Sequence, residues 1–198
     1  MFSCDKLKPE KGFDEKMLIK PEIVGKYHRL DKENIEIFLP EGFYLLDDDD
    51  LNEIHSRIED ENIRNYYEQA YEIESFMKHK LYRFYSKDYG AEVVIKPIPY
   101  VSFNKSDARQ LLYYLRKSFE GYQDKLGINH KKIKSTYFGN KSKQIFKAIY
   151  GLSRIKNIDD DEIFKAVYII SANKKTFMLT ILTPFEFDYD PLIKKIRL

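Results

Sequence analysis

Four strand-like runs follow one another in the last third of the sequence with no helical pattern between them, and this succession restricts the fold most. The runs cover 133–140, 144–152, 163–171 and 176–183. The last two are apolar at nearly every position, which is typical of the centre of a sheet, and Asn173-Lys174 between them predicts a tight turn. This part of the chain is therefore predicted to form an antiparallel meander with its C-terminal hairpin at the sheet centre.

The clearest helical pattern lies just before the meander. Ser106 is the expected N-cap, and Gly127 is the expected stop signal. The stripe between them has helical spacing and consists of Leu111, Leu112, Leu115, Phe119, Tyr122 and Leu126. We expect one long helix here, with its apolar side against the sheet.

Shorter patterns occupy the region upstream. A strand at 35–39 and an apolar run at 43–46 flank the turn Pro40-Glu41-Gly42. Asp47-Asp48-Asp49-Asp50 predicts the capped start of a helix, because aspartates satisfy and favour its positive end. A second helical pattern runs from 62 to 77.

Two further elements complete the layout. Runs at 81–85 and 91–98 predict a hairpin, in which Pro97 and Pro99 end the second arm or place it at a sheet edge. Asp190-Pro191 begins a short closing helix. Helices and strands do not alternate one-to-one, so the predicted fold class is α+β, an antiparallel β-sheet with helices packed on it.

The domain organisation is simple. Residues 1–26 are polar and hold two prolines and two glycines, which predicts a flexible N-terminal tether. Residues 27–198 fit a single α+β domain. Aromatic residues make up 15% of the chain, so we expect a core rich in Tyr and Phe. No run of about 18 apolar residues exists, so no transmembrane segment is expected.

This layout resembles the PsbP/Mog-type and DcrB-type α/β/α sandwich family. The resemblance covers roughly 35–198 and rests on the entry Ile35–Phe43, the long helix, the meander and the closing run 192–198. It implies a PsbP-like sandwich. It also implies a non-enzymatic accessory or binding role, often at a membrane as a lipoprotein or extrinsic subunit, and no catalytic residues to carry over.

The N-terminus carries a second resemblance. Ser3-Cys4 looks like the end of a bacterial lipobox, and the polar, Lys-rich stretch after Cys4 is similar to a lipoprotein tether. The apolar segment that should precede a lipobox is not in this sequence. Cys4 is therefore a lipidation candidate, with an ordinary N-terminus carrying a chance cysteine as the alternative.

Charge is segregated along the chain, although the net charge is only +2. Twelve acids and two arginines lie between 41 and 74, whereas 125–158 holds nine bases and no acid. The candidate basic surface consists of Lys131, Lys132, Lys134, Lys141 and Lys143. It would meet anionic lipid, nucleic acid or an acidic partner. The alternative is a solvated strand in which lysines protect a sheet edge.

Nothing in the sequence indicates catalysis, a metal or a cofactor. The acidic clusters 47–50 and 159–162 lack the alternating ligands and turn glycine of a calcium loop. No histidine pair has zinc-helix spacing, and no nucleophile elbow or phosphate loop is present. We therefore expect no enzyme, no metal site and no cofactor.

The functional expectation is a non-enzymatic binding or accessory domain of the bacterial cell envelope, membrane-anchored in the periplasm or outer envelope through Cys4. Its partner would be a protein or a membrane surface. The first alternative is a cytoplasmic protein-interaction protein of the immunity or adaptor kind, which binds a basic partner through its acidic helices. The second is a weak nucleic-acid binder that uses the basic 125–157 segment, although nucleic acid is the less expected partner.

Overall fold

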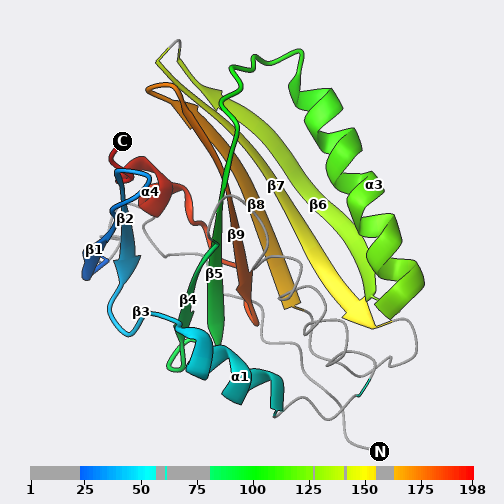
Figure 1. Ribbon diagram of the computed structural model, residues 1–198. Coiled ribbons are helices and arrows are strands. Elements are labelled where there is room, and N and C mark those ends of the chain that lie inside the picture. The colour runs from blue at the N-terminus through cyan, green and yellow to red at the C-terminus, as the bar shows by residue number, and fades with distance from the viewer. Residues whose placement is uncertain (1–22, 57–60, 62–80, 127, 141, 155–162) are drawn as a thin grey trace, which may run out of the picture.

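Two antiparallel sheets organise the chain in a computed structural model that describes residues 23–56, 61, 81–126, 128–140, 142–154 and 163–198 (Figure 1). The large sheet has seven strands in the order β3-β4-β5-β9-β8-β7-β6, and the small sheet pairs β1 with β2. The strands of the large sheet are β3 (Tyr44–Leu45), β4 (Tyr82–Ser86), β5 (Ala91–Ile98), β6 (Ile128–Gly139), β7 (Lys143–Arg154), β8 (Ile163–Ala172) and β9 (Lys175–Thr183). The small sheet and the helices are β1 (Gly25–Leu30), β2 (Ile35–Pro40), α1 (Asp48–Ser56), α3 (Ala108–Leu126) and α4 (Asp190–Lys194).

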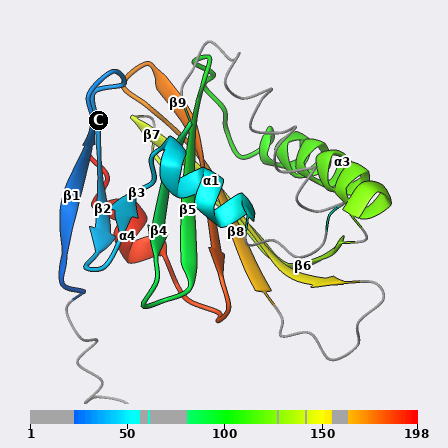
Figure 2. The ribbon, with the colours of Figure 1, turned by 60° about the horizontal axis from the view of Figure 1, so that its bottom comes forward.

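Each face of the large sheet carries its own core layer. One layer holds α4 and the small sheet, and includes Phe84, Ile170 and Phe177. The other layer holds α3, and includes Phe119, Phe146 and Tyr150. Helices α3 and α4 thus lie on opposite faces of the large sheet, with α4 between the small and large sheets (Figure 2).

The alternation of β7 supplies both layers. Phe146, Ala148 and Tyr150 point toward α3, while Ile145 and Ile149 point toward α4. Successive side chains of a strand lie on opposite faces, so a strand buried on both faces reads as a nearly continuous apolar run. The predicted antiparallel meander is confirmed, and β9 and β8 occupy the middle of the sheet as expected.

The turn between β8 and β9 is as short as the sequence predicts. Asn173 and Lys174 have φ values of 49° and 58°. Positive φ at both central residues is the mark of a two-residue hairpin turn whose twist matches the flanking strands. Asn tolerates this conformation well, whereas a Lys side chain makes it less favourable.

The helix starts show one confirmation and one correction. Asp47 and Asp50 cap α1 reciprocally, with backbone N–H groups donating to the opposite carboxylate at 3.1 and 2.8 Å. The predicted N-cap of α3 at Ser106 is wrong. Asp107 precedes the first helical residue, and its carbonyl accepts the first helical bond from the Leu111 N–H at 3.0 Å. Ser106 instead donates to the side chain of Asn104.

Two strand boundaries differ in detail from the sequence pattern. β1 begins at Gly25, two residues inside the segment predicted as tether, and Ile23 packs against the core. Pro97 pairs with Phe177 of β9, whereas the pairing of β5 with β4 extends only as far as Ile95, which pairs with Tyr82. Among the described residues, β9 is therefore the one strand beside β5 at Pro97.

Several sequence predictions lie outside the described residues. They concern the tether up to residue 22, Cys4, the helical pattern at 62–77, Lys141 and the acidic loop at 159–162. Among the described helices, none is long and apolar enough to cross a membrane.

Candidate functional site

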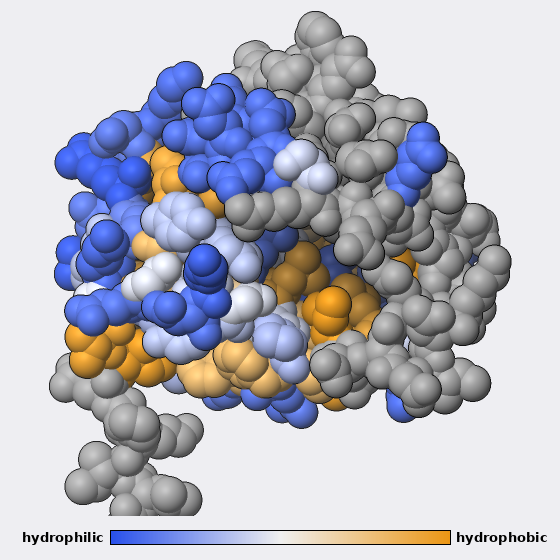
Figure 3. Space-filling view, turned by 90° about the horizontal axis from the view of Figure 1, so that it is seen from below, coloured by the Kyte–Doolittle hydropathy of each residue, from blue (hydrophilic) through white to orange (hydrophobic). Residues whose placement is uncertain are grey.

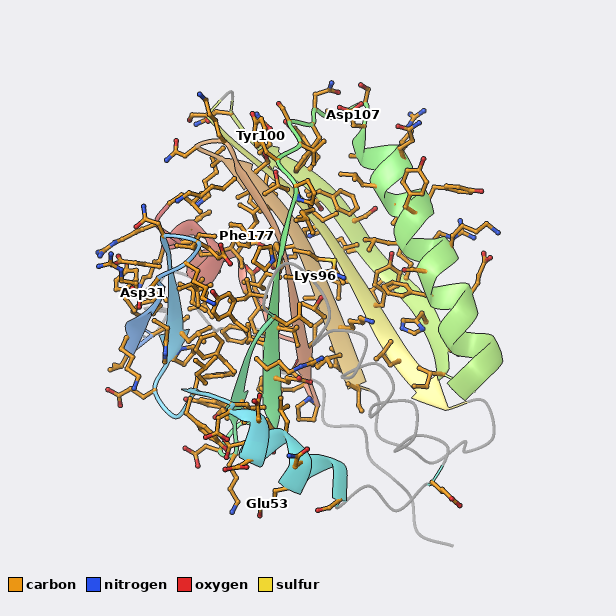
Figure 4. All side chains as sticks on the ribbon, in the orientation of Figure 1. Asp31, Glu53, Lys96, Tyr100, Asp107 and Phe177 are labelled. Carbon is orange, nitrogen blue, oxygen red and sulfur yellow. The ribbon has the colours of Figure 1, made fainter. Side chains whose placement is uncertain are left out.

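A cavity of about 410 Å³ opens into the layer between the small sheet and the large sheet. Strands β2, β5 and β9 line it, together with the segment after β9, including α4. Phe177 lies in the same layer further along β9 and is fully buried (Figure 4). The lining residues are Ile23, Val24, Ile37, Phe38, Leu39, Pro40, Glu41, Phe43, Tyr89, Ala91, Val93, Leu179, Ile181, Thr183, Phe185, Phe187, Tyr189, Leu192, Ile193 and Ile196.

The lining is almost wholly apolar. Among the described lining residues, Glu41 is the only one with a charged side chain. Thr183 is buried and donates its hydroxyl to the Phe185 carbonyl at 2.7 Å. Burial raises the pKa of Tyr189, which keeps its hydroxyl protonated and able to donate. A cavity of this size and character is typical of sites that bind an apolar ligand with few polar contacts.

Apolar side chains continue from the cavity to the molecular surface. Val24 is 66% exposed, Tyr89 and Phe185 are each 42% exposed, and Phe187 is 38% exposed. Figure 3 views the molecule from this end and shows apolar residues at the surface along its lower margin, beside strongly hydrophilic ones. We call Val24, Tyr89, Phe185 and Phe187 the rim of the cavity.

Two lysines of β7 contact the segment after β9, and this segment forms the wall of the cavity near the C-terminus. The Lys147 ammonium lies 2.7 Å from the Asp190 carboxylate and 3.3 Å from that of Asp188. Tyr168, fully buried on β8, donates its hydroxyl to the same Asp190 oxygen at 2.9 Å. Lys143 donates to the carbonyls of Ile193 and Ile196, both at 3.3 Å, and burial lowers its pKa.

The last residues of the sequence are held against β2 as well. Glu36 and Arg197 form an isolated antiparallel bridge with two backbone hydrogen bonds of 2.9 Å. The Arg197 guanidinium lies 3.8 Å from the Tyr27 ring centre, and the Lys195 ammonium lies 3.9 Å from that of Phe38. These cation–π contacts and the lysine contacts place the wall of the cavity at a fixed distance from the sheet.

The predicted basic surface does not form one cluster. Lys131, Lys132 and Lys134 are exposed on β6, which is an edge strand of the large sheet. A register shift between Lys132 and Lys134 marks a bulge at this edge. Lys143 does not belong to this basic surface. It lies at the other end of β7, is half-buried and donates to backbone carbonyls in and just after α4. Lysines and a bulge on an edge strand are also what protects such an edge from pairing.

A second group of titratable side chains lies in the α3 layer. The ring of His130 stacks on Phe119 with centroids 4.3 Å apart, and the Lys165 ammonium lies 4.3 Å from the same Phe119 centroid. Burial, aided by the Lys165 charge, lowers the pKa of His130 to about 4. Burial lowers the pKa of Lys165 to about 8, against an opposing effect of Glu92. This group packs against Phe119 on the α3 face of the large sheet, where His130 and Lys165 are only partly buried.

The described residues offer no centre for catalysis by a metal. Within the described ranges, no group of three or more His, Cys, Asp or Glu side chains is placed to hold a metal ion. The cavity lining, as far as it is described, contains neither a histidine nor a cysteine.

Sequence reasoning missed this cavity and its wall. The chain offered two signals, and the first is the run Phe185-Glu186-Phe187-Asp188-Tyr189, whose three aromatic residues all line the cavity. It also offered Ala91 and Val93 on the same face of β5. Neither pattern shows that these segments meet β2, because the pairing of distant segments is a property of the tertiary fold.

The layers define an α+β sandwich, with an antiparallel sheet between α3 on one face and α4 with the small sheet on the other. Among solved structures, cyanobacterial PsbP (CyanoP) from Synechocystis sp. PCC 6803 aligns with 89% of this chain and 93% of its own, with a TM-score of 0.54 and 12% identity. The fold is thus PsbP-like, as the sequence pattern predicts.

Other comparisons add little. The Ran-binding protein Mog1p of Saccharomyces cerevisiae aligns with 88% of this chain and 95% of its own, with a TM-score of 0.49 and 10% identity. No protein-family profile matches the sequence, and a comparison with curated proteins finds no match. At these identities the likeness to solved structures concerns the fold alone.

Proposed function

We propose that this protein is a non-enzymatic binding domain whose cavity receives an apolar group of its ligand. The observation that carries the proposal is the cavity itself, an apolar space of about 410 Å³ with an exposed apolar rim. Protein interiors are otherwise close-packed, and an apolar surface left open to water is costly unless something covers it.

The expected strength of this interaction is modest. Burial of a large apolar side chain or a short alkyl group removes about 150 Å² of surface from water, which stabilises by roughly 4 kcal/mol. Without further contacts this corresponds to a Kd near 1 mM. Contacts at the rim must therefore supply affinity and selectivity.

A solvatochromic neutral dye tests the proposal. Nile red should bind saturably at one site, with a blue-shifted emission. Val93→Phe places a ring into the cavity and should abolish the signal, and Ala91→Leu should weaken it. Val94→Phe is the matched control, because Val94 lies on the opposite face of β5. Folding of each variant is checked by circular dichroism. Equal binding by the wild type and both cavity variants would contradict the proposal.

We further propose that the domain is tethered to the bacterial envelope through an acylated Cys4. Ser3-Cys4 and the polar stretch behind it motivate this assignment. The chain enters the described fold at Ile23, which lines the cavity, so the tether would join the domain next to the opening. Expression from the native locus with its upstream DNA, followed by intact mass and fractionation, tests it. A soluble product that begins at Met1 or Phe2 would remove the tether and favour a cytoplasmic interaction protein.

A further inference from the structure

We infer that the ligand is a polypeptide segment in which a bulky apolar side chain is flanked on both sides by lysine or arginine. The inference rests on the proposed function, because it names the ligand class of the same cavity. Three features around the opening support it: the acidic side chains near it, the aromatic rings of its rim, and the three separate segments that carry the acids.

Acidic residues lie on the segments that line the opening. Glu41 lines the cavity, Asp88 precedes the rim residue Tyr89, and Glu186 stands between the rim residues Phe185 and Phe187. Asp188 adds a fourth carboxylate, which also contacts Lys147. The four acids are exposed. Lys87 is the sequence neighbour of Asp88, and the Lys195 ammonium lies 3.9 Å from the ring centre of the lining residue Phe38.

The segments that carry these acids come close to one another. A Cβ added to Gly42 would lie 2.9 Å from a carboxylate oxygen of Asp88, so the hairpin turn of β4 and β5 reaches the turn after Glu41. A Cβ added to Gly90 would lie 3.7 Å from Pro184, so the same hairpin also reaches the segment that carries Glu186. Three segments thus bring carboxylates to one opening.

Aromatic rings lie on the same segments as these carboxylates. Phe43 and Tyr89 stack with centroids 6.0 Å apart, and Phe187 and Tyr189 pack edge-to-face at 4.9 Å. Because Tyr89 and Phe187 are partly exposed, their rings are accessible to a cation, which an aromatic face attracts. A lysine or arginine would therefore contact a ring and a carboxylate at the same time.

The arrangement favours a polypeptide over a small cationic amphiphile. An amphiphile has one head group, whereas the carboxylates border the opening from three segments. A peptide can insert one apolar side chain into the cavity and present cations before and after it. Opposite charges placed in this way also steer the partner toward the site.

The absence of tryptophan from this chain allows a direct measurement. An octapeptide with a central Trp-Leu pair and two lysines at each end is titrated with the protein, and its Trp emission is excited selectively. Matched peptides carry serine or glutamate in place of the lysines. At low salt, the Lys peptide should bind about tenfold more tightly than the Ser peptide, and the Glu peptide should bind more weakly than either. The Lys advantage should shrink at 0.5 M salt.

Variants locate the effect on the protein. Glu41→Gln with Glu186→Gln should remove most of the Lys advantage and leave binding of the Ser peptide unchanged. Glu120→Gln on α3 is the control, since Glu120 is an exposed carboxylate on the opposite layer. Val93→Phe should abolish binding of the peptides and of Nile red alike.

The outcomes separate the two proposals. If Nile red does not bind at the cavity, the proposed function fails and this inference fails with it. If Nile red binds but the Lys, Ser and Glu peptides bind equally, only the inference is overturned. Dodecyltrimethylammonium that binds as tightly as the Lys peptide, below its micellar concentration, would also overturn it, because one head group would then suffice.

Discussion

The ammonium group of Lys147 lies 2.7 Å from the carboxylate of Asp190, which stands 43 positions later in the chain, and only 5% of the Lys147 side chain is exposed. Tyr168 completes the arrangement with a hydrogen bond to the same Asp190 oxygen. An ion pair of this kind is costly to break, since loss of Lys147 leaves Asp190 uncompensated and loss of Asp190 leaves the buried Lys147 with only Asp188, at 3.3 Å. The pair therefore fixes the segment after β9 against the large sheet.

Removal of one partner should destabilise the fold. We expect Lys147→Met and Asp190→Asn each to lower the free energy of unfolding by about 3 kcal/mol, measured by urea denaturation. The double variant should lose less than the sum of the two single losses, because it leaves no lone charge. Amide hydrogen exchange should rise chiefly in 188–198. Additive losses would contradict the coupling.

An exposed ion pair provides the control for this prediction. Lys117 lies 2.7 Å from Glu120 on α3, with both side chains more than half exposed. Lys117→Met should leave the denaturation midpoint unchanged within error, since exposed pairs contribute little.

Replacement of Lys174 by glycine should stabilise the protein. Lys174 has a φ of 58° in the β8–β9 turn, a conformation that glycine adopts without steric cost. Asn-Gly is also the favoured pair for this turn. We expect a gain of about 0.5–1 kcal/mol in the free energy of unfolding for Lys174→Gly. Lys175→Gly, one residue later inside β9, should destabilise instead.

The stability of the fold should decrease as the medium becomes acidic. Burial lowers the pKa of His130 from 6.5 to about 4, so the unfolded chain takes up a proton before the folded one does. The loss should begin below pH 6.5 and be complete near pH 4. Because the ring is only half-buried, we expect about 2 kcal/mol from this residue.

A variant isolates the contribution of His130. His130→Leu should flatten the pH dependence of urea denaturation between pH 6.5 and 4. Burial also lowers the pKa of His28, so part of the slope should persist until His28 is replaced as well. An unchanged slope in the double variant would assign the effect to other groups.

The lysines of β6 offer a test of the nucleic-acid alternative. If they bind nucleic acid, single-stranded DNA should retard the protein at low salt, and Lys131→Glu with Lys132→Glu and Lys134→Glu should abolish the retardation. Lys87→Glu with Lys105→Glu and Lys174→Glu changes the net charge equally at other exposed positions and should have no effect. An equal loss in both triple variants would indicate net charge alone.

Local patterns were sufficient to predict most elements. The stripe from Leu111 to Leu126 gives α3, and Asn173-Lys174 gives the central hairpin, because both signals depend on residues close in sequence. Ser106 is a residue type that favours the N-cap position, but Asp107, which favours it too, precedes the first helical residue. One residue of uncertainty at a helix end is usual.

The site depended on contacts that local patterns do not contain. In the sequence Lys143 belongs to a run of lysines, which predicts a basic surface. In the strand its side chain lies on the face that packs against α4. The alternation of Phe146 and Ala148 already placed Lys147 on the other face, between Ile145 and Ile149. A lysine between apolar neighbours on one face indicates a buried cation, but its partner Asp190 lies too far along the chain to be recognised.

The double use of β7 has a consequence for how this protein can vary. Even-numbered residues from Phe146 onward build the α3 layer, while odd-numbered ones build the layer that holds Lys147 and the cavity wall. Inserting or deleting a single residue would exchange the two sets, placing aromatic rings beside Asp190 and a lysine against α3. The number of residues in β7 is therefore constrained by both core layers at once.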